Sequence, residues 1–280
     1  MVNAQFEPLA KLWGVENKKV PELLDREAKL IRIDGKLQPL LNNLYFEGTY
    51  VDVKANKINI NTVDQSKVEK VRNSSQMKKY KKYLKFKKAT NSLSQLKSTF
   101  VQIIKLAQKF NIINGIISIE PKVNNVVIYL KDKNDPKNKE FIKMEKRQID
   151  PIILGGNEIV TWFGPRPLRC SADVANPRNI EYLIIGSTEI ASTNIHVCKS
   201  GFVTGVICGH VKALDTTVLS ETGPKVGVFL TSIHEVSDDS GGSTFRYSHD
   251  DYSIPLVYAV GILVSSEDPD DDSEEEDEGP

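Results

Sequence analysis

The stretch NIHVCKSGFVTGVICGHVKAL, residues 194–214, decides the expected fold of the second half of this 280-residue chain. Two runs rich in valine and isoleucine lie on either side of a short segment that contains glycine and threonine. Such runs are typical of β-strands, and glycine between them favours a turn. We therefore predict short strands with a turn signal between them in this stretch, which also holds Cys198 and Cys208.

The remaining chain after about residue 150 has the same character. Short apolar runs with turn signals recur at EYLIIGS (181–187), GPKVGVFLTSI (223–233) and YAVGILVSS (258–266). Strands that follow one another every 8 to 12 residues or so indicate an all-β sandwich or barrel. Three prolines, Pro165, Pro167 and Pro177, mark loops near the start of this region.

The first half, residues 1–150, indicates an α+β region instead. Helical patterns cover Phe6 to Trp13, a segment that begins near Pro21, a short segment from Asp64, and Ser92 to Phe110. In the last of these, apolar residues recur on one face, as in an amphipathic helix. Two hairpins are expected at Phe46 to Ile60 and at Ile113 to Asp132, because each range has a polar turn between two β-rich runs.

Charge is distributed unevenly, although the whole chain has 37 Lys and Arg against 37 Asp and Glu. Residues 1–150 hold 30 basic and 16 acidic side chains, whereas residues 151–280 hold 7 and 21. Modules of opposite sign attract each other, so we expect the first half to contact the second. Ten acids lie between Glu267 and Glu278, and their repulsion predicts a disordered acidic tail over residues 265–280.

Several classes of partner are not expected. No apolar run reaches the roughly 18 residues of a membrane-spanning helix, so we expect no membrane partner. The run from Lys78 to Lys88 has two interpretations, a nucleic-acid patch or a solvated basic face, and we favour the second and expect no nucleic-acid partner. The four His and three Cys show no zinc-ligand spacing, so we expect no metal site.

Three segments of the second half resemble the streptogrisin and alpha-lytic endopeptidase branch of the chymotrypsin-like serine proteases. RCSADV (169–174) is similar to the first-barrel strand, and SDDSGGS (237–243) resembles the loop that holds the nucleophile. VCKSGFVTGVICGHVKAL (197–214) is similar to the family's cysteine-flanked hairpin and is the strongest match. GTYVDVKANKINI (48–60) looks like the sheet motif of the matching pro-region.

The resemblance implies an α+β pro-region-like domain (1–150) followed by an all-β, truncated trypsin-like double β-barrel domain (151–264). In this family the pro-region assists folding of the protease and then inhibits it, and the mature enzyme is a secreted serine endopeptidase that needs no cofactor. Localisation would then be extracellular. The opening residues nevertheless lack the basic and apolar regions of a secretory signal peptide.

Cysteine positions follow the same resemblance. Cys198 and Cys208 look like the family's disulfide pair, and the two arms of a hairpin can bring them within bonding distance. Cys170 is left unpaired, since its family partner would stand at Thr188. Three cysteines cannot all pair within one chain.

Ser240 stands where the family has its nucleophile, but the groups that would activate it are missing. Alignment on the strand around Tyr182 places Ser187 where the base His belongs. Only ten residues separate Ser187 from Cys198 and none is Asp, so the catalytic carboxylate is missing as well. The oxyanion hole, formed by the backbone at Ser240 and two residues before it, is altered because Asp238 replaces a glycine there. A carboxylate beside a developing oxyanion is repulsive.

We therefore expect a serine endopeptidase homologue that is catalytically inactive, either a pseudoprotease or an incomplete copy. Two alternatives stay open. The chain could be an active secreted endopeptidase that uses Ser240 on peptide or protein substrates, or its pro-region could act in trans as a chaperone or inhibitor of a related protease.

Overall fold

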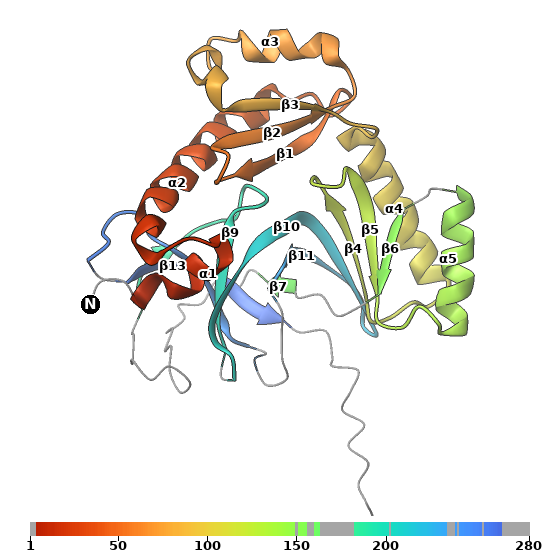
Figure 1. Cartoon of the computed structure of the whole chain (residues 1–280). Helices are drawn as coiled ribbons and strands as arrows, with labels where there is room; N and C mark the ends of the chain where they lie inside the picture. The colour runs from red at the N-terminus through yellow and green to blue at the C-terminus, as the bar shows by residue number, and fades with distance from the viewer. Residues whose placement is uncertain are drawn as a thin grey trace, which may run out of the picture.

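The computed structural model describes residues 4–148, 151–155, 160–162, 182–201, 203–233, 239, 241–253 and 255–264. Several predicted positions lie outside these residues, namely Cys170, Asp238, Ser240, the prolines at 165, 167 and 177, and the acidic tail. Figure 1 shows the arrangement of the described elements.

Two helices open the chain where the sequence predicts them. They are α1 (Glu7–Trp13) and α2 (Val20–Leu37). Helix α1 ends at Gly14, whose φ of +59° is favourable for glycine and costly for other residues. Helix α2 begins at Val20 with Pro21 in its first turn, and it buries one face that includes Leu30 and Ile33. No described helix is long and apolar enough to cross a membrane.

A three-stranded sheet follows α2. Strand β1 (Phe46–Asp52) pairs antiparallel with β2 (Lys57–Thr62), and β3 (Leu84–Lys88) lies parallel to β2. Asn56 has a φ of +54° in the β1–β2 turn, which confirms the predicted hairpin and its turn. The short helix α3 (Val68–Arg72) lies in the connection to β3, as Figure 1 shows, and the helix expected from Asp64 is therefore confirmed.

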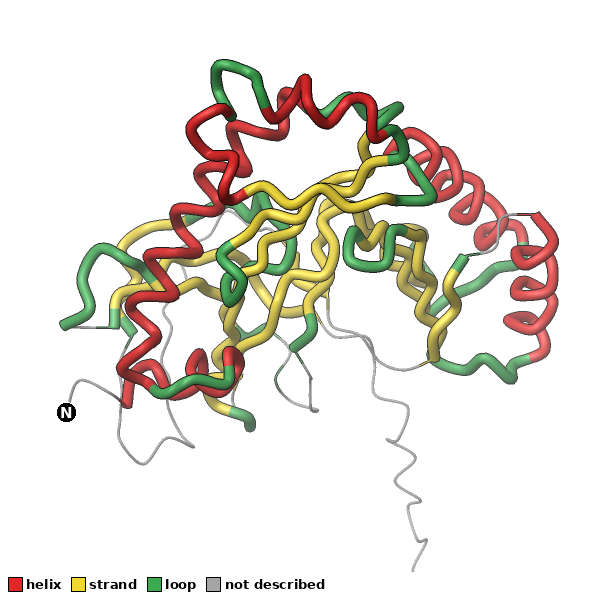
Figure 2. Tube along the Cα trace, turned by 45° about the horizontal axis from the view of Figure 1, so that its top comes forward, coloured by secondary structure: helices red, strands yellow, loops and turns green. Residues whose placement is uncertain are grey.

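Helix α4 (Leu93–Lys109) packs on the second predicted hairpin, which consists of β4 (Gly115–Glu120) and β5 (Asn125–Leu130). Ser92 caps this helix through a reciprocal pair of hydrogen bonds with Gln95. Helix α5 (Pro136–Gln148) connects β5 to the parallel strand β6 (Ile152–Gly155). Figure 2 shows both helices on the outer side of these strands, and Phe141 of α5 is fully buried in the core there.

The second half adds seven strands: β7 (Val160–Trp162), β8 (Leu183–Ser187), β9 (His196–Gly201), β10 (Gly205–Ser220), β11 (Gly223–Thr231), β12 (Ser243–Tyr247) and β13 (Leu256–Val264). They join β4, β5 and β6 in one mixed ten-stranded sheet with the order β11-β7-β13-β12-β9-β10-β4-β5-β6, and β8 pairs with β13. Strand β11 also pairs antiparallel with β10, so it has β7 on one side and β10 on the other.

The double β-barrel that the resemblance implies is not what the described residues form. They form an α/β structure, with an N-terminal α+β region and then one large mixed sheet. The physical reason lies in β10, which has 16 residues and can therefore pair with β9 near its start and with β4 near its end. The predicted α+β and all-β regions thus share backbone hydrogen bonds between Thr216 and Ser118 and their neighbours.

The largest hydrophobic core also contains residues from both halves. Trp13, Leu24 and Ile60 belong to the same buried cluster as Val197 and Phe245. In Figure 1, helix α1 lies beside β9 and β10, and contacts join α1 to β10. Separation of the two halves would therefore expose apolar surface on each of them.

Candidate functional site

The hairpin that carries the strongest resemblance forms the base of the candidate site. Strands β9 and β10 pair antiparallel, and Cys198 lies opposite Cys208. A disulfide joins the two cysteines, whose Cα atoms are 4.0 Å apart. This is the pair that the resemblance implies.

Asp239, which precedes Ser240, is held on this hairpin by a buried ion pair. Its Oδ2 lies 2.5 Å from Lys199 Nζ, and both side chains are fully buried. Its Oδ1 accepts a hydrogen bond from the backbone N–H of Val203 at 2.9 Å, and the Thr204 hydroxyl donates to Oδ2 at 2.5 Å. Burial opposes ionisation of Asp239, but hydrogen bonds from Lys199 and Thr204 outweigh it and lower the pKa of this carboxyl.

Glycines make this close approach possible. A Cβ at Gly201 would lie 2.2 Å from Asp239 Oδ1, and a Cβ at Gly242 would lie 2.5 Å from the Ser200 carbonyl oxygen. Gly241 has a φ of +83°, and its N–H donates to the Leu263 carbonyl at 3.0 Å. Asp239 is therefore held by side-chain charge, and Gly241 is held by a backbone hydrogen bond to the adjacent strand.

The predicted catalytic residues can be placed only in part. Ser240 and Asp238 lie outside the described residues, although Asp239 and Gly241 on either side of Ser240 are described. Ser187 is exposed at the end of β8, where it pairs with Ala259 of β13. The next residue, Thr188, donates its backbone N–H to the Ala259 carbonyl at 2.9 Å. Cys170, for which the resemblance implies no partner, lies outside the described residues.

His196 is the histidine with the most extensive contacts among those described. Its Nδ1 lies 2.5 Å from Glu27 Oε2, and its Nε2 accepts the backbone N–H of Tyr247 at 3.0 Å. A ring nitrogen that accepts an N–H carries no proton, so this imidazole is neutral with its proton on Nδ1. Burial lowers the pKa of His196 further than the neighbouring carboxylate raises it.

Glu27 and Arg246 complete a buried cluster around this imidazole. Arg246 Nη2 lies 2.7 Å from Glu27 Oε2, and the His196 backbone N–H donates to Glu27 Oε1 at 2.8 Å. Burial opposes ionisation of Glu27, but His196 and Arg246 outweigh it and lower its pKa from 4.5 to about 2. Both nitrogens of the ring are occupied, so His196 has no free nitrogen to accept a proton from a substrate or a nucleophile.

The sequence did not point to this cluster. Glu27 lies in α2 and His196 in β9, and His196 follows Glu27 by 169 positions in the sequence. The only signal was a glutamate at a helix position that the apolar pattern places on the buried face, between Leu24 and Leu30. A buried carboxylate needs partners, but periodicity cannot identify them.

The other histidines lie in different surroundings. His210 is partly buried, and desolvation together with Lys122 lowers its pKa to about 4. His249 lies 4.0 Å from Asp250 on the surface. His234 is outside the described residues. Within the ranges that the structure describes, no three His, Cys, Asp or Glu side chains come together as metal ligands would.

Comparison with known proteins does not assign the chain to a family. No protein-family model matches it, and a search of curated proteins gave no match.

Proposed function

We propose that this chain is a non-catalytic homologue of streptogrisin-like serine endopeptidases whose N-terminal region stays attached to a shortened protease-like part. The observation that carries the proposal is the buried Glu27–His196–Arg246 cluster. It uses both nitrogens of the one fully buried histidine that the structure describes, and it joins helix α2 to β9 and β12.

The loop that would hold the nucleophile supports the relation to a protease. Asp239 is anchored by Lys199 beneath the hairpin, and Gly241 and Gly242 adopt positions that larger residues would strain. Such an anchor holds Asp239 in place next to the candidate nucleophile, which a nucleophile requires of its neighbours and an arbitrary surface turn does not. We take the part of the sheet where β11 pairs with both β7 and β10 to be the remnant of the second barrel of that family.

The region around Ser187 supports loss of activity. An active enzyme of this kind needs a base within hydrogen-bond reach of the serine hydroxyl and an acid behind that base. Ser187 stands at the position expected for the base, and a hydroxyl there cannot accept the nucleophile's proton at neutral pH. Without general base catalysis about 10²- to 10⁴-fold of rate is lost.

Contacts along residues 192–194 support the idea that the N-terminal region remains attached. Ser192 donates to Asp34 at 2.6 Å, Thr193 donates through its hydroxyl to the Thr49 carbonyl at 2.8 Å, and the Thr193 carbonyl accepts from Val51 N–H at 3.0 Å. A released N-terminal region would leave these buried groups without partners. The N-terminal region therefore acts as a permanent part of the fold.

A fluorophosphonate probe tests the proposal, because it reacts with an activated serine hydroxyl. The full-length chain, its Ser240→Ala variant and an active trypsin control are incubated with the probe. We expect labelling of the full-length chain no stronger than that of the variant, and we expect the 280-residue species to persist on a gel. Labelling that disappears with Ser240→Ala, or autocatalytic cleavage near residue 150, would overturn the proposal.

A further inference from the structure

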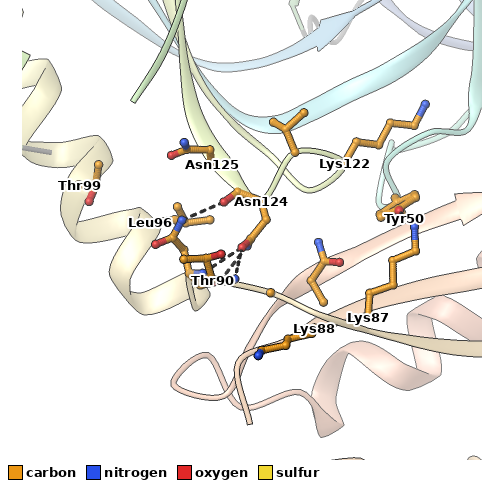
Figure 3. Close-up of a pocket in the computed structure, with 13 residues that line it drawn as sticks. Tyr50, Lys87, Lys88, Thr90, Leu96, Thr99, Lys122, Asn124 and Asn125 are labelled. Carbon is orange, nitrogen blue, oxygen red and sulfur yellow. Dashed lines mark hydrogen bonds between the residues drawn. The ribbon is translucent and has the colours of Figure 1, made fainter. Parts of the chain in front are cut away.

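A polar cavity of about 530 Å³ lies between the end of β3 and the β4–β5 turn. All of its lining residues belong to the first half of the chain. Three lysines line it, Lys87 and Lys88 from β3 and Lys122 from the turn. Tyr50, Asn91 and Asn124 complete the part of the lining that matters here. We call these six residues the lysine pocket. Figure 3 shows Lys87 and Tyr50 on one side of it, with Asn124 and Thr90 on the other.

The wall formed by Asn124 is rigid. Its Oδ1 accepts the backbone N–H groups of Thr90 and Asn91 at 2.8 and 2.9 Å. Its Nδ2 donates to the Asn91 carbonyl at 2.8 Å, and Asn91 Nδ2 donates back to the Asn124 carbonyl at 3.0 Å. Four hydrogen bonds thus fix the β3–α4 connection to the β4–β5 turn, so the pocket exists without a ligand.

All charged groups in the lining are positive. None of the 13 lining residues is Asp or Glu. Lys87 Nζ donates to the Tyr50 hydroxyl, and neither Lys88 nor Lys122 forms an ion pair with a residue in the described part of the chain. The acids that act on Lys122 are Asp52 and Glu120, which do not line the pocket, and desolvation together with Lys212 outweighs them and lowers its pKa.

We propose that the lysine pocket binds the phosphate or sulfate ester group of a small ligand. Ammonium groups are donors that suit such oxyanions, and the three lysines offer them in a lining that contains no carboxylate. Its volume lies within the usual range of small-molecule sites, about 300 to 1,000 Å³. None of the lining residues belongs to the segment around Ser240, so the proposal does not depend on whether the chain hydrolyses peptides.

The alternative occupant is a long polyanion spread over the whole basic surface. Lys78, Lys79, Lys81, Lys82 and Lys85 are exposed on and near β3 and do not line the pocket. A diffuse surface of this kind attracts any polyanion in proportion to its charge. If the ligand binds in the lysine pocket, a lysine that lines the pocket should contribute more to its affinity than an equally charged lysine outside it.

Calorimetric titration of the full chain with pyrophosphate and with a sulfated disaccharide tests the proposal, at constant ionic strength and with the unsulfated disaccharide as the neutral probe. Lys88→Gln and Lys122→Gln each remove one charge from the pocket. Lys85→Gln removes the same charge from the same strand outside it. All three lysines are exposed, so the fold should survive, which a thermal unfolding curve verifies.

We expect saturable binding of at least one anionic probe and none of the neutral probe. Lys88→Gln and Lys122→Gln should each weaken it about tenfold, the effect of one lost charge-assisted hydrogen bond, and Lys85→Gln less than twofold. Val123→Glu should abolish binding, since Val123 is 49% exposed and lines the cavity. Equal losses for all three lysine variants would show a diffuse basic surface, and absence of saturable binding of either anionic probe would show no site; either result overturns the proposal.

Discussion

Replacement of Glu27 by glutamine should destabilise the protein by about 3 kcal/mol at pH 7. The carboxyl of Glu27 has its pKa lowered from 4.5 to about 2 by His196 and Arg246, against the opposing effect of burial. Since one pKa unit corresponds to roughly 1.4 kcal/mol, the ionised form stabilises the fold by about 3 kcal/mol. Glutamine keeps the shape and loses the charge, so it leaves Arg246 without its counterion and the His196 Nδ1–H without a charged acceptor.

The sign of the pH dependence follows from the same values. The pKa of Glu27 is lower in the folded chain, so its contribution is fully present above about pH 4.5 and is lost as the pH falls from 4.5 towards 2. The pKa of His196 is also lowered by burial, so the unfolded chain binds that proton first and stability begins to fall below about pH 6.5. The difference between the wild type and Glu27→Gln should therefore shrink in acid.

The assay is urea unfolding at pH 7 and at pH 3, followed by tryptophan fluorescence. Trp13 is a local reporter, because its ring packs edge-on against His196 with centroids 5.8 Å apart. Glu22→Gln is the matched control, since Glu22 lies on the same helix in an exposed pair with Arg26 and should change stability by under about 1 kcal/mol. A loss below about 1 kcal/mol for Glu27→Gln at pH 7, or the same loss at both pH values, would refute this reasoning.

Three further substitutions test other buried groups by the same unfolding assay. Asp239→Ala leaves the buried Lys199 ammonium unpaired and should lower the free energy of unfolding by about 3 to 5 kcal/mol. A second substitution, Lys199→Met, should restore part of that stability. If the double variant is no more stable than Asp239→Ala, the ion pair is not the cause. Glu47→Gln should stabilise the protein at pH 8 by up to about 3 kcal/mol, because burial raises the pKa of Glu47 to about 7. The wild type therefore loses stability as the pH rises from 4.5 through 7, and the variant does not. An equal effect of the substitution at pH 4 and at pH 8 would contradict this. Gly242→Ala should cost about 1 to 3 kcal/mol through overlap with a backbone oxygen, whereas Gly35→Ala, which meets nothing within 4 Å in α2, should be neutral or stabilising.

Local structure was largely predictable from the sequence because its signals are local. The Ser92 and Gln95 pair marks the start of α4, and it forms the reciprocal cap. Asn56 and Asn124 stand in the two predicted turns, and both have positive φ values near +50°. Each of these residues stabilises structure within a few positions of itself, so these caps and turns can be predicted without the tertiary structure.

Strand pairing between distant segments was not predictable in the same way. Strand β10 pairs with β4 about 100 residues earlier, with Thr216 opposite Ser118 and Val218 opposite Ile116. Strand β10 could have paired with the edge of several other strands, since backbone hydrogen bonds do not depend on side-chain identity. The strands at 196–201 and 205–220 form the expected hairpin, but they belong to a large mixed sheet and not to a double β-barrel, because β10 also pairs with β4 of the first half.

The candidate site illustrates the same limit. The resemblance implied the disulfide between Cys198 and Cys208, which the structure contains. It gave no indication that Lys199, beside one of these cysteines, is fully buried against Asp239. Lysine in a strand ordinarily indicates exposure, and only a partner 40 residues later makes burial tolerable.

Strand β9 connects the two buried charge clusters. His196 and Lys199 are three residues apart on this strand, so their side chains point to opposite faces. One face receives Glu27 from the N-terminal helix, and the other receives Asp239 from the segment before Ser240. A buried charge without its partner costs several kcal/mol, so β9 is stable in its observed place only when both distant segments are present. We therefore expect removal of the N-terminal region to leave His196 without Glu27 and so to destabilise the strand that also holds Asp239.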